Sequence, residues 1–200
     1  MLSRPLILAS SSAIRLQLLR SAGMDVTAHA ARVDEEAVKA SLESEGVRPV
    51  DIADSLAEMK AAKVSGRHAR ALVLGCDQVL DLKGTVLSKP ATRADARGQL
   101  VALRGQTHSL LSAAVLYDAG QPIWRHVAKA RLTMRTFSDS YLDDYLARNW
   151  PEIGTSVGAY QLESEGVRLF DRIDGDYFTI LGLPLLPLLS YLSTRGFIPS

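Results

Sequence analysis

The residue with the clearest chemical demand in this chain is Asp77, which lies inside the apolar run ALVLGCDQVL at residues 71–80. An unpaired carboxylate is costly to bury, so a carboxylate in a buried strand needs hydrogen-bond donors, a cation or a metal ion. We interpret Asp77 as a rigidly held site residue that could bind Mg²⁺ or orient a water molecule. The pattern leaves one alternative open, an aspartate at a frayed strand end bonded to turn amides.

A second candidate site is the N-terminal run LILASSSAIRLQLL, in which a short apolar strand leads into serines and then a helical pattern. Ser10 and Ser12 are good turn and N-cap residues. Unpaired backbone N–H groups and the positive end of the helix dipole make such a junction suitable for an anion. Arg15 would add a planar, permanently charged group. We predict phosphate binding here, with an ordinary strand–helix connection as the alternative.

Three further charged residues are candidates on weaker grounds. Lys89 precedes a proline that holds the chain extended, so it could reach back toward Asp77. Lys60 lies near the end of a helical pattern, and Glu35 ends an expected strand, where it could be a second metal carboxylate. Each has a plain alternative: a solvated loop lysine, a surface helix lysine and a helix-start acid, respectively.

Helices and strands must position these residues, and hydrophobic periodicity places both along the chain. Strands are expected at residues 6–9, 26–33, 71–80, 86–87, 107–117, 124–137, 167–173 and 177–181. Helices are expected directly after the serines and at residues 36–42, 50–64, 93–103, 139–148 and 185–194. This interleaving, with a long central hairpin, predicts a mixed α/β fold in a single domain spanning residues 1–200.

Composition excludes several classes of protein. The formal net charge of +1 argues against a general attraction to nucleic acid or anionic membranes, so a phosphate site must depend on a few local cations. The single cysteine, Cys76, excludes an internal disulfide and a multi-cysteine zinc site, and we expect it to be a small buried residue. The sequence contains no P-loop, no nucleophile elbow and no signal-peptide pattern. We therefore predict a cytoplasmic protein without a nucleic-acid or membrane partner.

Several short motifs, in their order and spacing, together resemble the Maf family of nucleoside triphosphate pyrophosphatases over nearly the whole chain. They are the N-terminal run quoted above, VDE at residues 33–35, LAEMKA at 56–61, GCDQV at 75–79, LSKP at 87–90, GAY at 158–160 and IDGDYFTILGLPL at 173–185. The resemblance implies a bent mixed β-sheet flanked by helices, with two lobes around a deep cleft, as in inosine-triphosphatase-like proteins.

The resemblance also implies an activity. Members of the family hydrolyse a nucleoside triphosphate at the α–β phosphate bond, giving the nucleoside monophosphate and pyrophosphate, with a divalent metal such as Mg²⁺ or Mn²⁺. They are regarded as house-cleaning enzymes that remove modified nucleotides, they are linked to arrest of septum formation, and they are often homodimers.

Position by position, the resemblance assigns substrate binding to the candidate cations and serines. Ser10, Ser12 and Arg15 match the family's phosphate-binding run. Lys60 matches its helix lysine, and Lys89 matches its lysine before proline. These residues would hold the phosphates of the nucleotide.

The carboxylates receive different roles from the same resemblance. Asp77 matches the proposed general base and is therefore the expected catalytic residue, while Glu35 matches the family's acidic position. Together they would hold the divalent metal ion.

Departures from the family pattern bear on substrate and turnover. A usual proline and arginine are replaced by Ala13 and Ile14, and a common lysine is replaced by Ser156, so two cations are missing. Gln78 and Glu163 resemble the branch that prefers 7-methyl-GTP, and Glu163 could pair with the positive charge that methylation places on guanine. The missing cations leave open an alternative, a nucleotide-binding regulator of septum formation with little catalytic turnover.

Overall fold

The structure, a computed structural model, describes residues 4–199 and confirms the mixed α/β fold. One seven-stranded sheet has the order β2-β1-β3-β5-β6-β7, with β4 beside β3. Its strands are β1 (Leu6–Leu8), β2 (Val26–Ala28), β3 (Leu72–Leu82), β4 (Thr85–Leu87), β5 (Thr107–Asp118), β6 (Gln121–Met134) and β7 (Phe170–Asp174). The helices are α1 (Ala13–Ser21), α2 (Glu35–Ser44), α3 (Pro49–Ser65), α4 (Arg93–Leu103), α5 (Asp139–Asn149), α6 (Tyr177–Ile180) and α7 (Leu185–Thr194).

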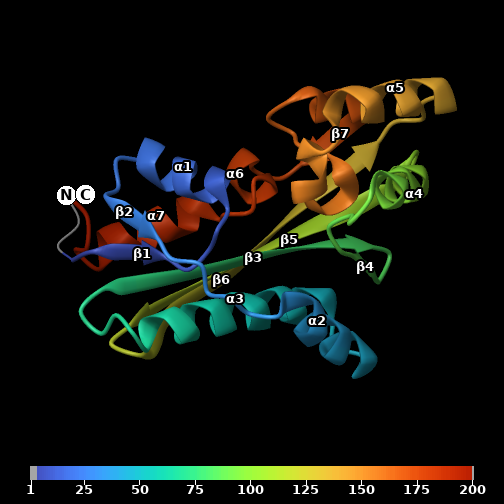
Figure 1. The fold of residues 1–200 in the computed structure, drawn as a ribbon. Coiled ribbons are helices and arrows are strands. Elements are labelled where there is room, and N and C mark those ends of the chain that lie inside the picture. The colour runs from blue at the N-terminus through green and yellow to red at the C-terminus, as the bar shows by residue number, and fades with distance from the viewer. Residues whose placement is uncertain (1–3, 200) are drawn as a thin grey trace.

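The long strands β3, β5 and β6 form a spine that runs the length of the molecule (Figure 1). Strand β1 pairs in parallel with β2 and β3, whereas β3, β5, β6 and β7 pair antiparallel, so the sheet is mixed. Helix α3 covers one face of the spine. On the other face, α1, α6 and α7 lie toward one end and α4 and α5 toward the other (Figure 1). The spine thus carries two lobes on a single face, which we call the N-terminal lobe (α1, α6 and α7) and the C-terminal lobe (α4 and α5).

Strand β3 contributes to both faces, which explains its nearly continuous apolar sequence. Leu74 and Cys76 pack under the N-terminal lobe and Leu80 under the C-terminal lobe, while Val73 and Val79 face α3. Cys76 is fully buried, as expected, and burial raises the pKa of its thiol to about 11. A thiol held neutral in this way is a packing residue and not a nucleophile.

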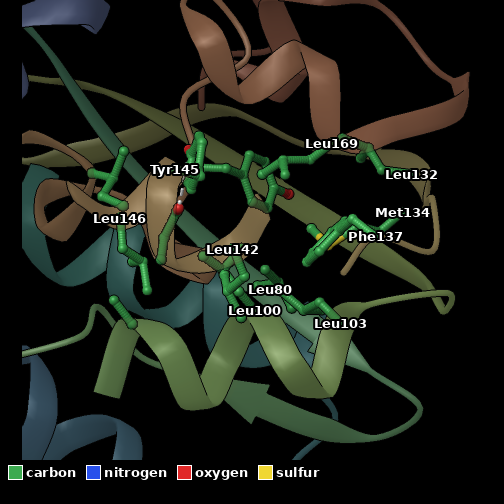
Figure 2. Close-up of a cluster of buried hydrophobic side chains, with 14 of the residues drawn as sticks. Leu80, Leu100, Leu103, Leu132, Met134, Phe137, Leu142, Tyr145, Leu146 and Leu169 are labelled. Atoms are coloured by element: carbon green, nitrogen blue, oxygen red, sulfur yellow. Dashed lines mark hydrogen bonds between the residues drawn. The ribbon is translucent and has the colours of Figure 1, made fainter. Parts of the chain in front are cut away.

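The C-terminal lobe has its own apolar core, in which side chains from the spine meet α4 and α5 (Figure 2). The residues labelled there are Leu80, Leu100, Leu103, Leu132, Met134, Phe137, Leu142, Tyr145, Leu146 and Leu169. The N-terminal lobe is built around a separate core from α1, α7 and β1. These two cores share one face of the sheet, and a third apolar cluster lies on the other face, under α3.

Most expected elements are present, but the strands expected at residues 26–33, 167–173 and 177–181 are partly or wholly wrong, and the first of them ends at Ala28. The helices expected at residues 93–103 and 185–194 coincide with α4 and α7. A strand is expected at residues 177–181, but Tyr177–Ile180 forms α6, because Asp176 accepts a hydrogen bond from the Thr179 N–H at 2.9 Å and caps a helical turn. The strand expected at 167–173 begins only at Phe170, and a 3₁₀ turn, η3 (Glu165–Leu169), precedes it.

Candidate active site

A cleft of about 890 Å³ brings together every residue that the sequence singled out for substrate, metal or catalysis. These are Ser10, Ser12, Arg15, Glu35, Lys60, Asp77, Lys89 and Glu163. They come from the N-terminal lobe, α2, α3, the spine, the loop after β4 and the segment that follows η2 (Val157–Ala159). Residues separated by as many as 153 sequence positions therefore line one space.

Asp77 lies in the middle of β3 and not at a frayed end, because it pairs with Ala113 within the long β3–β5 ladder. Only 5% of the residue is exposed. Its Oδ1 accepts a hydrogen bond from the Lys60 Nζ at 2.6 Å, and Lys60 is itself 6% exposed. The buried carboxylate thus has the cationic partner that its burial requires, and Lys60 is not a surface lysine.

A glycine sets the distance between α3 and β3 that this pair needs. A Cβ atom on Gly75 would lie 2.1 Å from the Ala57 carbonyl oxygen and 2.9 Å from the Ala61 Cβ. A side chain at position 75 would therefore push α3 away from the sheet. Gly75 and Asp77 lie on the same face of β3, so the close approach allowed by Gly75 brings Lys60 within reach of Asp77.

Glu35 is joined to the same lysine from the other side. It is the first residue of α2, which Asp34 caps by accepting a hydrogen bond from the Ala37 N–H at 3.1 Å. The expectation that Glu35 ends a strand is wrong, because β2 stops at Ala28. Its Oε2 lies 2.8 Å from the Lys60 Nζ, so one ammonium group bridges two carboxylates.

The donors fit a divalent metal that binds together with substrate phosphates. Within residues 4–199, no group of three or more His, Cys, Asp or Glu side chains is placed to hold a metal ion. Mg²⁺ is usually bound through one or two carboxylates, with water and substrate phosphate oxygens completing its coordination. Glu35 and Asp77, which share Lys60, provide such a pair of oxygen ligands.

The serine run ends β1 and caps α1, as both interpretations of it require. The Ser10 Oγ accepts from the Ser12 N–H at 3.1 Å, and the Ser12 Oγ accepts from the Arg15 N–H at 3.4 Å. Helix geometry leaves the Ala13 and Ile14 N–H groups without an acceptor inside the helix. Both residues line the cleft, so this end of α1 presents donors and the positive end of the helix dipole to it.

Arg15 is held more tightly than its sequence position suggested. Its Nε donates to the Gly182 carbonyl at 2.8 Å, and its Nη1 donates to the carbonyl of Cys76 at 3.0 Å and to the Ser10 Oγ at 3.4 Å. These acceptors are neutral, so the positive charge of the guanidinium is oriented but not cancelled by them. Gly182 permits the contact, because a Cβ there would lie 3.0 Å from the Arg15 Nε.

Lys89 forms no ion pair with Asp77 among the described residues, and Asp77 pairs with Lys60 instead. Lys89 lines the cleft, and its side chain remains accessible to solvent there. Partial desolvation lowers the pKa of Lys89, the positive charges of Arg15 and Lys60 lower it further, and Glu35 and Asp77 act in the opposite direction. A lysine among other cations gains a favourable partner when a polyanion enters.

A polar network beside Asp77 was missed by sequence reasoning. The Gln78 Nε2 donates to the Ser112 Oγ at 2.9 Å and to the carbonyls of Thr179 and Ile180 at 3.1 and 2.9 Å. Ser112 in turn donates to the Thr179 carbonyl at 2.7 Å. The network fixes α6 to the spine between the two apolar cores. Gln78 itself, a second polar residue directly after Asp77 in the same buried run, is the sequence feature that indicates such a network.

Glu163 lines the cleft from the C-terminal lobe and is exposed to solvent. It lies beyond η2, in which Gly158 adopts a φ of +80° and packs against Leu80 of the spine. The acidic side chain therefore belongs to the exposed rim of the cleft, in contrast to the buried Lys60–Asp77 pair.

The fold and the site together define an α/β protein whose cleft is lined by both cations and carboxylates, two of which share a buried lysine. The chain belongs to the Maf family, whose model, described as Maf-like protein, matches residues 5–195. This confirms the family that the sequence motifs resemble. No helix within residues 4–199 has the length and apolar character needed to cross a membrane.

Curated relatives match the chain over nearly its full length. A protein of Roseobacter denitrificans named nucleoside triphosphate pyrophosphatase is 60% identical over 98% of both chains. One of Ruegeria pomeroyi with the same name is 59% identical over 97% of this chain and 98% of the relative. One of Mesorhizobium japonicum, named 7-methyl-GTP pyrophosphatase, is 51% identical over 98% of both chains.

Proposed function

We propose that the protein hydrolyses a nucleoside triphosphate between its α and β phosphates, producing a nucleoside monophosphate and pyrophosphate. The observation that carries the proposal is the cluster of Asp77, Lys60 and Glu35, buried or half-buried in a cleft that also holds Arg15 and Lys89. Relatives up to 60% identical bear the name of this activity. House-cleaning of modified nucleotides is the role that we assign to the reaction.

The cations and the start of α1 hold the phosphates in this proposal. Arg15, Lys60 and Lys89 supply three positive charges around two carboxylates. Ser10 and Ser12 shape the turn so that the first N–H groups of α1 face the cleft. Binding a triphosphate among fixed donors keeps its α-phosphorus in place for attack, which is where most of the rate enhancement of such enzymes arises.

Glu35 and Asp77 would hold Mg²⁺ or Mn²⁺ together with the phosphates. When bound, the metal would neutralise phosphate charge and make pyrophosphate a better leaving group. The two carboxylates are already bridged by Lys60, so the ammonium group keeps them close together in the free protein.

Asp77 acts as the general base. Its Oδ1 is bonded to Lys60, which leaves Oδ2 to accept a proton from water. The water oxygen forms a bond to the α-phosphorus as its proton passes to Asp77. The bond from the α-phosphorus to the bridging oxygen breaks, and its electron pair leaves with pyrophosphate.

The substrate that we propose is a nucleotide with a methylated guanine, 7-methyl-GTP. Glu163 lies on the rim of the cleft, where a nucleobase can reach it while the phosphates occupy the cationic part. A carboxylate pairs with the positive charge of 7-methylguanine better than a neutral amide would. One of the close relatives carries the name of this activity.

The test is to incubate the purified protein with 7-methyl-GTP and with the canonical ribo- and deoxynucleoside triphosphates, with Mg²⁺ or Mn²⁺, and to resolve the products by chromatography. We expect monophosphate and pyrophosphate, formed fastest from 7-methyl-GTP and absent after metal removal by a chelator. The same products formed faster from dTTP or UTP would keep the reaction and overturn the substrate. Tight nucleotide binding with no product would overturn the reaction and favour the regulator of septum formation.

A further inference from the structure

Helix α2 carries Glu35 but is weakly held by apolar contacts. None of its residues is fully buried, and it packs on α3 through the partly buried Val38 and Leu42. A helix with so little buried surface has few contacts that could fix its position at a catalytic distance. The ion pair with Lys60 holds the end of the Glu35 side chain, so the position of the helix itself depends on other polar contacts.

Three polar side chains connect α2 to the loop that carries Lys89. The Lys39 Nζ donates to the Ser88 Oγ at 2.6 Å and to the Glu36 Oε1 at 2.9 Å. Ser88 donates to the Glu36 Oε2 at 2.9 Å. Glu36, Lys39 and Ser88, which we call the α2 clamp, thus form a closed ring of hydrogen bonds across 49 and 52 sequence positions.

The α2 clamp is adjacent in sequence to two residues of the site. Glu36 follows Glu35, and Ser88 precedes Lys89. The carbonyl of Ser88 also accepts from the Gln99 Nε2 at 2.8 Å, which anchors the loop to α4. The clamp therefore connects α2 to the C-terminal lobe through the loop that holds Lys89.

The charges in the α2 clamp balance each other. The Lys39 side chain is only 11% exposed, whereas that of Glu36 is 69% exposed. Because the Lys39 charge is matched by Glu36, the clamp adds little net charge to the cleft. The clamp therefore affects the site by fixing the position of α2 relative to the Lys89 loop, and not by adding charge.

We infer that the α2 clamp positions Glu35 relative to Lys89, so that Glu36, Lys39 and Ser88 are positioning residues of the reaction. The inference rests on the proposed function. The ring sets how far α2 lies from the Lys89 loop, and that separation sets where the metal carboxylate and the phosphate-binding lysine lie around the substrate. A shift of about 1 Å in such groups is enough to slow a reaction strongly.

The test uses Ser88→Ala, which removes both hydrogen bonds made by the hydroxyl, and Ser88→Thr, which keeps a hydroxyl. Ser41→Ala is the matched control, because the Ser41 hydroxyl donates to Glu45, the C-cap of the same helix, and lies outside the clamp. For each variant we would measure the Mg²⁺ concentration that gives half-maximal activity, the KM for nucleotide, and amide hydrogen exchange in α2.

We expect Ser88→Ala to raise the half-activating Mg²⁺ concentration and the KM by about tenfold and to speed exchange in α2, but not in α3. Ser88→Thr should restore the wild-type values, and Ser41→Ala should leave them unchanged. Unchanged kinetics and exchange in Ser88→Ala would overturn the inference, as would faster exchange without a kinetic change. If the wild-type protein hydrolyses no nucleotide, the proposed function fails, and unchanged exchange in Ser88→Ala would show separately that the clamp does not hold α2.

Discussion

The floor and the rim of the cleft are built in different ways. The floor is the Lys60–Asp77 pair, whose side chains are 7% and 8% exposed and lie between α3 and the central strand of the sheet. The rim carries Glu35, Lys89 and Glu163 on α2 and on two loops, and the Glu35 side chain is 43% exposed. Backbone packing at Gly75 fixes the floor, whereas a few polar side chains fix the rim.

This difference indicates which residues carry out catalysis and which bind and select the ligand. Charges in the floor are shielded from water, so their interactions are strong and their geometry is rigid. Charges on the rim are more accessible to solvent than those of the floor, which suits them to capturing and selecting a ligand. Substitutions in the floor should therefore abolish turnover, and substitutions on the rim should change affinity, pH dependence or selectivity.

The largest effect is expected from Asp77→Asn, which keeps the shape of the side chain and removes the base. We expect kcat to fall about 10²–10⁴-fold, because an amide cannot accept the proton from water. Asp81→Asn is the matched control, since Asp81 is on the same strand and bonds to the hairpin N–H of Gly84. Steady-state kinetics on both variants, with circular dichroism to confirm folding, would measure the difference. Near wild-type turnover in Asp77→Asn would show that the floor does not carry the chemistry.

Gly75→Ala tests whether packing sets the floor. The added Cβ would lie 2.1 Å from the Ala57 carbonyl, so α3 must move and Lys60 must move with it. We expect a loss of about 3 kcal/mol in the free energy of unfolding, together with a lower kcat. Gly98→Ala is the control, because Gly98 lies in α4 with no atom within 4 Å of an added Cβ, and it should stabilise the protein by about 1 kcal/mol. Urea denaturation measures both changes, and equal effects would contradict the account.

A smaller effect, on the pH dependence of kcat/KM, is expected from Lys89 on the rim. The pKa of Lys89 is lowered by partial desolvation and by the charges of Arg15 and Lys60, so Lys89 loses its proton at a lower pH than an ordinary lysine. Since the protonated form binds phosphate, kcat/KM should fall on the alkaline side before ordinary lysines titrate. Lys89→Arg keeps its charge and should move this fall to higher pH. An alkaline limb that is identical in both proteins would rule Lys89 out as its cause.

The smallest effect is expected from Glu163→Gln, which tests selectivity and not chemistry. We expect the preference for 7-methyl-GTP over GTP to drop by about tenfold while kcat for GTP changes little, because only the methylated base carries the matching charge. Competition between the two nucleotides in one reaction would measure the ratio directly. A ratio equal to that of the wild-type protein would mean that the rim does not select through Glu163.

The sequence predicts the floor residues better than their arrangement. Asp77 stands out because a carboxylate in a buried strand needs a partner, but nothing in the sequence identifies Lys60 as that partner. That pairing depends on the close approach of α3 at Gly75, a distance that local patterns do not contain. For the same reason, the carbonyl acceptors of Arg15 could not be foreseen, since Gly182 is 167 positions away in sequence.

The errors in secondary structure have a similar cause. Residues 177–181 are rich in aromatic and branched side chains, which favours a strand. The cap formed by Asp176 and Thr179 outweighs that preference, and the buried backbone of α6 is then fixed by Gln78. Local preference was overridden by one cap and by a contact about 100 positions away in sequence.

The central claim is that water attacks the α-phosphorus. The most direct test is to run the reaction in water labelled with the heavy isotope of oxygen and to measure the masses of both products by mass spectrometry. Attack by a water that Asp77 activates at the α-phosphorus predicts the label in the nucleoside monophosphate and none in pyrophosphate. Label in pyrophosphate would mean attack at the β-phosphorus, and inorganic phosphate with a diphosphate would mean cleavage at a different bond. Either result would contradict the account.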